Sequence, residues 1–288
     1  MINYLTYNFL VFLRFLVSSI PRKFTLFLGK LLGIFIYYII PIRKKVAKIN
    51  ISIAFPELSD KEVNKIILKS YKHYGMLLFE FITQNNKNIY NNIDELDNKT
   101  KKCLTDDVGK ILMTAHIGNW ELMLPVISKL KKIIGVAREQ KNKGANKFII
   151  ENRSFNNVEL ISNKGSTRKM AKALLKNKIL LLVCDQNAKS KGNKLLFFNK
   201  ESSFPKGPGY FHFLTNSELL YGFCILNKNY KYELKIRNLN IEKKIEQKDE
   251  LVIQINRLYI KKLEEIIIKY PEQYFWFHKK WDKTIYDS

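Results

Sequence analysis

Between residues 110 and 184 the chain alternates between short apolar runs and segments with helical spacing, and this alternation restricts the fold more than any other feature. The apolar runs occupy residues 110–115, 133–138, 158–161 and 178–184. The segments with helical spacing lie between them, at residues 120–130, 143–153 and 167–176. Strands joined by helices are typical of parallel sheets whose two faces are both covered. The sequence therefore predicts an α/β fold with a mainly parallel central sheet and helices on both faces.

Further elements are predicted on either side of this region. Ser59 and Glu62 have the spacing of a capping box, and apolar residues then recur at helical spacing as far as Leu78. Residues 85–110 are polar and rich in Asn, so we expect a connection with little regular structure there. The remaining predicted elements are a helix after Pro205, strands near residues 219–226 and 230–237, and a last amphipathic helix that stops at Pro271.

The beginning of the chain contains two apolar stretches, at residues 4–20 and 24–42, and each is interrupted by one cation, Arg14 or Lys30. Each stretch is near the minimum length for crossing a bilayer. Aromatic residues crowd both stretches and basic residues follow at once, a pattern typical of a membrane-anchored or interfacial segment whose basic end lies in the cytoplasm. A helical hairpin buried in a soluble core is the alternative interpretation.

We therefore expect residues 1–42 to form a hydrophobic, membrane-anchoring helical segment and residues 43–288 to form the α/β domain. The sequence leaves open whether the first segment spans the membrane or lies on it.

The charge of the chain predicts a polyanionic partner. Lys and Arg number 50 and Asp and Glu number 26, which gives a formal net charge of +24. Nucleic acid, an anionic membrane face, a phosphorylated glycolipid and an acidic carrier protein would all satisfy this charge. Basic residues interleaved with exposed aromatics, or a recognisable nucleic-acid-binding module, are not found in the sequence, so we expect no nucleic-acid partner.

The cysteines indicate a reducing compartment. Cys103, Cys184 and Cys224 are odd in number, widely spaced and without a CxxC pair, which argues against a disulfide framework and against a structural zinc site. Cys184 lies within an apolar run and is expected to be a small buried hydrophobe.

His116 follows directly after the apolar run 110–115, and Glu121 comes five residues later. In open α/β sheets, reactive groups gather at the carboxyl ends of strands, which is where His116 is expected to lie. A short loop that contains Gly118 could fold back so that Glu121 contacts the imidazole and fixes one tautomer. The histidine could then remove a proton from a hydroxyl group.

A second polar pair, Asp185 and Gln186, ends the run 178–184 and is therefore expected at the same edge of the sheet. Phe197 and Phe198 follow, and the segment 205–209 (PKGPG) comes after them. The sequence PEQYFWFHKKW occupies residues 271–281.

Together these motifs resemble the late acyltransferases of lipid A biosynthesis, the lauroyl and myristoyl transferases. The resemblance covers nearly the whole chain. It rests on the hydrophobic N-terminus and on the following matched segments and residues: NISIAFPE at 50–57, HIGNWE at 116–121, Arg138, Arg153, DQ at 185–186, FF at 197–198 with the later PxGP, and WFHKKW at 276–281. The chain departs from the family where Asn199 replaces a glycine and where Lys279 and Lys280 stand in place of arginine.

The resemblance implies transfer of a fatty acyl chain from acyl carrier protein to the hydroxyl of a hydroxyacyl chain on a lipid A precursor, with His116 as general base. It also implies a phosphorylated glycolipid acceptor, membrane lipids as neighbours, and a place on the bacterial inner membrane with the active site facing the cytoplasm. No metal and no cofactor is expected beyond acyl carrier protein as co-substrate.

The oxyanion and substrate-binding candidates are Arg153, Arg138, Asn119, Gly118, Asp185 and Gln186. Lysines and arginines that could receive the acidic carrier are Lys129, Lys131, Lys132, Lys141, Lys143, Lys147, Lys164, Arg168 and Lys169. A phospholipid or other glycolipid acyltransferase with the same catalytic pair is the nearest alternative. The sequence leaves open the acyl chain length and the hydroxyacyl chain that is modified.

Overall fold

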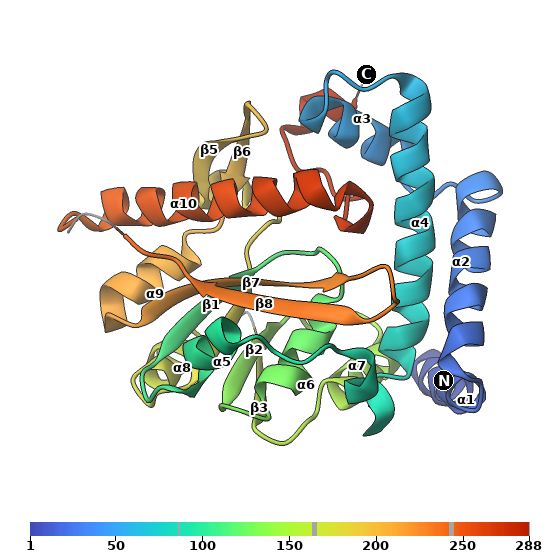
Figure 1. Cartoon of the computed structure of the whole chain (residues 1–288), viewed down its shortest axis with the longest axis horizontal. Helices are drawn as coiled ribbons and strands as arrows, with labels where there is room; N and C mark the ends of the chain where they lie inside the picture. Colours follow the sequence, from blue (N-terminus) through green and yellow to red (C-terminus); the bar gives the residue numbers. More distant parts are fainter. Residues whose placement is uncertain (86, 163–165, 242–244, 288) are drawn as a thin grey trace.

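The computed structural model describes residues 1–85, 87–162, 166–241 and 245–287. Within these residues, six strands form one sheet in the order β3-β2-β4-β1-β7-β8 (Figure 1). The strands are β1 (Lys110–Thr114), β2 (Ile133–Ala137), β3 (Val158–Ser162), β4 (Ile179–Val183), β7 (Glu218–Leu226) and β8 (Tyr232–Asn238). Neighbouring strands are parallel, except that β8 runs antiparallel to β7. The predicted mainly parallel sheet is confirmed.

Helices cover both faces of the sheet, as predicted. One face packs against α8 (Thr167–Leu174), α9 (Gly207–Thr215) and α10 (Lys248–Lys269). The other face packs against α5 (Asn98–Thr105) and α6 (Met123–Ile127). Every residue of β1 is buried, because this strand lies in the interior of a sheet that is covered on both sides.

The long helix α4 (Asp60–Ile82) begins at the predicted capping box. The Ser59 side chain accepts a hydrogen bond from the backbone N–H of Glu62, and the Glu62 carboxylate accepts one from the backbone N–H of Ser59. This reciprocal pair satisfies two N–H groups that the helix itself leaves without partners. The short helix α3 (Lys44–Ala54) precedes α4, and α4 runs along one side of the sheet (Figure 1).

The first two helices, α1 (Ile2–Ser18) and α2 (Arg22–Tyr38), pack on the body of the molecule. Helix α2 lies so close to α4 that a Cβ atom on Gly75 would lie 2.1 Å from the carbonyl oxygen of Gly29. Helix α1 packs on α7 (Lys143–Asn152), where the Tyr7 hydroxyl donates a 2.9 Å hydrogen bond to Glu151. Among the described residues, no helix combines the length and the apolar character needed to cross a membrane.

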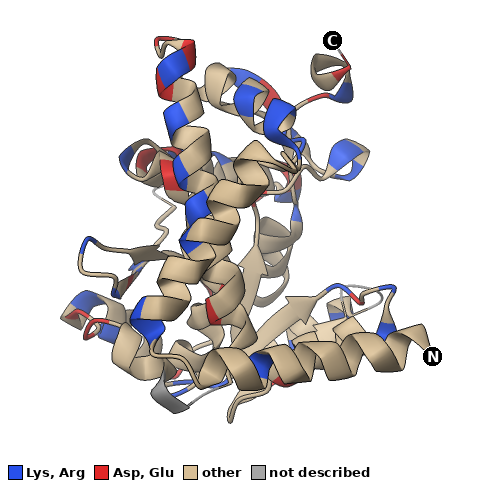
Figure 2. Cartoon of the chain, turned by 90° about the vertical axis from the view of Figure 1, so that its right-hand side faces the viewer, with Lys and Arg blue, Asp and Glu red and all other residues tan. Residues whose placement is uncertain are grey.

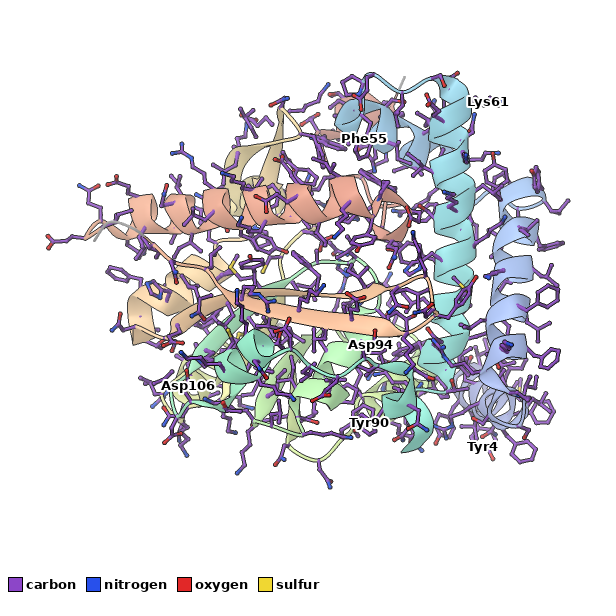
Figure 3. All side chains as sticks on the ribbon, viewed as in Figure 1. Tyr4, Phe55, Lys61, Tyr90, Asp94 and Asp106 are labelled. Carbon is purple, nitrogen blue, oxygen red and sulfur yellow. The ribbon has the colours of Figure 1, made fainter. Side chains whose placement is uncertain are left out.

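The outer faces of α1 and α2 are nonetheless apolar. Figure 2 shows few charges along α1, and Figure 3 shows Tyr4 at the outer edge of the molecule. The exposed apolar side chains of the two helices include Tyr4, Leu5, Phe9, Phe12, Phe15, Leu16, Phe24, Phe27, Leu28, Leu31, Phe35 and Tyr38. Part of the predicted hairpin is therefore packed and part faces outward.

Two regions differ from the sequence prediction. The polar stretch 85–110 contains the 3₁₀ helix η1 (Lys87–Asn92) and the helix α5, so the expectation of little regular structure was wrong. Asp97 is the N-cap residue of α5: its side chain accepts a hydrogen bond from the N–H of Thr100 and pairs with Arg237 of β8 at 2.7 Å. The pairing with a strand far along the chain was not visible in the local sequence.

The second difference is a hairpin of β5 (Asn193–Phe197) and β6 (Lys200–Phe204), which forms a separate two-stranded sheet. Its turn residues, Phe198 and Asn199, both have positive φ angles, 47° and 58°. Turns of this kind match the twist of a hairpin, and Asn tolerates the left-handed region better than most residues. Asn199 therefore adopts the left-handed conformation at the position where the family that the sequence resembles has glycine.

Candidate active site

The segment between β1 and α6 carries His116 and turns sharply at Gly118, whose φ angle is +58°. A Cβ atom at Gly118 would lie 2.0 Å from the carbonyl oxygen of Cys224, so only glycine fits this position without movement of the backbone. The N–H of Gly118 donates to the carbonyl of Gln273, and the N–H of Asn119 donates to the carbonyl of Cys224. These bonds attach the turn to the segment after α10 and to β7.

The backbone of His116 is held from two further directions. The Tyr74 hydroxyl of α4 and the N–H of Phe275 both donate to the His116 carbonyl, at 3.1 and 2.9 Å. The imidazole is consequently presented by a backbone that has little freedom to move.

The His116 side chain contacts Asp185. Nδ1 of the imidazole lies 2.7 Å from Oδ1 of Asp185, which follows β4, the strand next to β1. The His116 side chain is 20% exposed and that of Asp185 is 4% exposed. Because a carboxylate can only accept a hydrogen bond, Nδ1 carries the proton and Nε2 keeps its lone pair. Nε2 lies 3.4 Å from Nε2 of Gln186 at the cleft described below.

The surroundings of the pair raise the pKa of His116. Burial is the largest influence and lowers this pKa, but the charge and hydrogen bond of Asp185, together with the charge of Glu121, outweigh it. Burial also acts on Asp185, whose pKa nevertheless ends below its usual range because of His116 and Lys280. The pair therefore favours an ionised aspartate beside a histidine of increased basicity.

Glu121 does not contact the imidazole, so the predicted orienting role of Glu121 toward His116 is corrected by the structure. Its carboxylate accepts two hydrogen bonds from Arg153, at 2.8 and 2.6 Å, and one from the Trp120 indole N–H at 3.1 Å. The Trp120 ring in turn packs edge-on to the imidazole, with 4.9 Å between ring centroids. Glu121 lies on the 3₁₀ turn η2 (Trp120–Leu122), and Arg153, the C-cap residue of α7, reaches it there.

The predicted oxyanion donors fall into two groups. The backbone amides of Gly118 and Asn119 already donate to the carbonyls of Gln273 and Cys224, so these two predicted donors are not free to bind an oxyanion. Arg138, Gln186 and Arg153 line the cleft beside His116. The guanidinium of Arg153, however, already donates two hydrogen bonds to the Glu121 carboxylate.

A cleft of about 780 Å³ opens at the carboxyl edge of the sheet. Polar side chains, among them His116, Glu121, Arg138 and Arg153, form one part of its lining. The apolar part includes Leu124, Gly135, Leu160, Leu181 and Val183. Most of these apolar residues lie on the sheet face that packs against α5 and α6. The cleft is therefore lined by the imidazole of His116, by an apolar floor and by the cationic side chains of Arg138 and Arg153.

Several residues that hold the site were not predicted from the sequence. Tyr74 and Lys280 both reach the His116–Asp185 pair from elements far along the chain, and His73 lies 3.3 Å from the carbonyl of Gly118. The signal that could have identified Asp185 was present, because both His116 and Asp185 were expected at carboxyl ends of strands. Among the residues that the structure describes, no group of three or more His, Cys, Asp or Glu side chains is placed to hold a metal ion.

An α/β sheet that presents a histidine–aspartate pair to an apolar-floored cleft is an arrangement suited to general base catalysis on a hydrophobic substrate. The model of the bacterial lipid A biosynthesis acyltransferases matches residues 1–283, so the chain belongs to this family.

Two curated relatives support the same family. They are the lipid A biosynthesis palmitoleoyltransferase of Escherichia coli (strain K12) and the lipid A biosynthesis acyltransferase of Shigella flexneri. Each is 23% identical over 270 residues, which cover 91% of this chain and 86% of the relative. Among solved structures, the 1-acyl-sn-glycerophosphate acyltransferase PlsC from Thermotoga maritima matches with a TM-score of 0.37 and 13% identity, over 86% of this chain and 99% of that one.

Proposed function

We propose that this acyltransferase moves a fatty acyl chain from acyl carrier protein to the hydroxyl of a hydroxyacyl chain on a lipid A precursor. The observation that carries the proposal is the His116–Asp185 pair, whose Nε2 has a lone pair and lies at the edge of an apolar-floored cleft. Membership of the lipid A acyltransferase family supports the choice of substrates.

In the proposed reaction, Nε2 of His116 removes the proton of the acceptor hydroxyl as the oxygen attacks the thioester carbonyl carbon. The resulting tetrahedral oxyanion collapses, the carbon–sulfur bond breaks, and the thiolate takes the proton from the imidazolium. The products are an ester and the free thiol of the carrier. Asp185 stabilises the imidazolium that forms between the two proton transfers.

Arg138 and Gln186 are the best-placed donors for the oxyanion, because both line the cleft beside His116. Arg153 contributes positive charge from its pair with Glu121. Two proton donors of its guanidinium already face that carboxylate, so we assign to Glu121 and Arg153 the shape and charge of the cleft wall.

The acyl chain would lie on the apolar floor. Gly135 is central to this floor, because its missing side chain leaves the space between Leu124 and Leu160. A Cβ atom at Gly135 would lie 3.2 and 3.1 Å from the nearest side-chain atoms of these two leucines. We therefore expect this part of the cleft to limit the length of the transferred chain.

The remaining partners follow from charge and exposure. The acidic carrier and the glycolipid phosphates would meet the basic residues at the cleft and on the adjoining α7, which include Arg138, Lys141, Lys143 and Lys147. Lys164, another predicted contact, lies outside the described residues. The exposed apolar faces of α1 and α2 would rest on the cytoplasmic side of a bacterial inner membrane, in the manner of interfacial helices.

The test is acyl transfer by purified His116→Ala protein with acyl carrier protein as donor and a lipid A precursor as acceptor. We expect a loss of roughly 10²- to 10⁴-fold in kcat, since a general base contributes about that factor. His212→Ala is the matched control, because His212 lies on α9 and bonds to the Ser217 carbonyl. Near-normal turnover in the His116 variant would contradict the proposed base.

Mass spectrometry of lipids from cells with and without the protein tests the acceptor. Lipid A that lacks one secondary acyl chain supports the proposal. An unchanged lipid A together with an altered phospholipid or another glycolipid would instead support the alternative acceptor.

A further inference from the structure

Lys280 is a buried cation behind the active site. It is 3% exposed, and its Nζ donates a hydrogen bond to the backbone carbonyl of Asp185. The ammonium group also lies over the Phe204 ring, 3.6 Å from its centroid, and 5.2 Å from the centroid of Phe197. Such a position stabilises a cation that has lost its hydration.

The backbone of Lys280 is fixed from three directions. Its N–H donates a 2.9 Å hydrogen bond to the hydroxyl oxygen of Tyr286. Its carbonyl accepts hydrogen bonds from Ser202 of β6 at 2.8 Å and from Asn187 at 3.0 Å. The side chain therefore enters the core from a backbone that is held in place.

The charge of Lys280 has few partners. Among the described residues, Nζ forms no ion pair within 4.0 Å, and the carboxylate that acts on it most strongly belongs to Asp185. Burial is the largest influence on Lys280 and lowers its pKa to about 7, against the opposing charge of Asp185. A lysine is seldom buried without a carboxylate in direct contact, because the desolvation cost is large.

We propose that Lys280 is a positioning residue, which holds the backbone of Asp185 in place and balances the buried charge that Asp185 presents to His116. The contact carrying this inference is the hydrogen bond from Nζ to the Asp185 carbonyl, made inside the core and directly behind the catalytic pair. The inference rests on the proposed role of His116 as the base.

The other titratable groups around Asp185 are ill suited to this task. They are His116, Tyr74, Tyr259, Tyr274, Cys184 and His278. Burial raises the pKa of the three tyrosines and of the cysteine and lowers that of His278, so these five stay neutral near pH 7. Apart from the protonated imidazole itself, Lys280 is the cation among these neighbours that can compensate Asp185.

The first experiment measures kcat/KM against pH for Lys280→Met and Lys280→Arg, with Lys279→Met as the matched control. Removal of a nearby cation favours protonation of the His116–Asp185 pair, so the acid limb of Lys280→Met should move to higher pH by about 1 unit. We expect a loss of roughly 10-fold near pH 6 that becomes smaller at higher pH. Lys280→Arg should restore the position of the limb.

Lys279 is a suitable control because it lies next to Lys280, is half-exposed and pairs with Asp287 at 3.7 Å. Its variant should keep the wild-type profile. A Lys280→Met enzyme with an unchanged acid limb, whether fully active or impaired, would overturn the inference. A wild-type rate that survives His116→Ala would instead contradict the proposed function and leave the stability measurement below to decide about Lys280.

The second experiment does not depend on activity. Thermal unfolding is measured for Asp185→Asn, Lys280→Met and the double variant. If the two charges compensate each other, the double variant should be more stable than the two single losses predict by addition, because neither charge is then buried alone. If Lys280→Met alone does not fold, a double variant that does fold still shows the compensation, because removal of the second charge has then restored stability. Strictly additive losses would overturn the inference.

Discussion

Two carboxylate–cation sets lie beside the same histidine, and they differ in depth. Asp185 and Lys280 are both almost fully buried, and Asp185 bonds directly to the imidazole. Glu121 and Arg153 bond to each other at the cleft wall, where the Arg153 side chain is 22% exposed. The first set contacts the base, and the second set contacts the space into which substrates would enter.

The difference teaches that closeness in the sequence does not determine which acid forms a hydrogen bond with His116. Glu121 is five residues from His116, but its neighbours on the turn direct its carboxylate toward Trp120 and Arg153. Asp185 is 69 residues away, and the parallel pairing of β1 with β4 brings it to Nδ1. We propose that the inner set controls the proton on His116 and that the outer set controls the charge and shape of the cleft wall.

The largest expected effect comes from breaking the inner set. Asp185→Asn removes the acceptor that keeps the proton on Nδ1, and the amide can instead stabilise the unproductive tautomer. We expect kcat to fall roughly 10²- to 10⁴-fold, by analogy with other histidine–aspartate pairs. Steady-state kinetics of the purified variant test this expectation. A variant that keeps more than half of the wild-type kcat would show that Asp185 does not orient the base.

A smaller effect is expected from the outer set, where a double-mutant cycle separates two roles of Glu121. Glu121→Gln and Arg153→Met should each lower kcat/KM by about 10- to 100-fold, because each substitution leaves the other residue of the ion pair without an opposite charge at the cleft wall. If Glu121 acts through Arg153, the double variant should be little worse than either single variant. A loss in the double variant equal to the product of the two single losses would indicate that Glu121 acts on the reacting groups independently of Arg153.

The smallest expected effect is a shift in the pH dependence. The base is active when His116 is deprotonated, and its pKa is raised above the ordinary value of 6.5, so kcat/KM should fall as the pH drops through a value above 6.5. In Asp185→Asn, the largest influence that raises this pKa is gone, and the acid limb of the residual activity should move to lower pH. Profiles that coincide would contradict the coupling of the two residues.

The strands and most helices could be predicted from the sequence because their signals are local. The run 110–115 is apolar at Ile111, Leu112, Met113 and Ala115, and the capping box at Ser59 starts α4 by contacts within four residues. The exceptions needed distant partners. The N-cap residue of α5, Asp97, pairs with Arg237 of β8, and the β5–β6 hairpin turns at Phe198 and Asn199 without the usual glycine.

The candidate site divides in the same way. The sequence by itself determined the position of His116 and of Asp185 at carboxyl ends of strands, because apolar runs that end in a polar residue define such ends. The tertiary structure alone decided which acid reaches the imidazole and that Lys280 points inward to the Asp185 carbonyl. Strand order and side-chain packing bring Asp185 to His116 across 69 positions of sequence, and Lys280 to Asp185 across 95 positions. No local sequence pattern encodes which of several nearby charged residues will contact Nδ1 of His116.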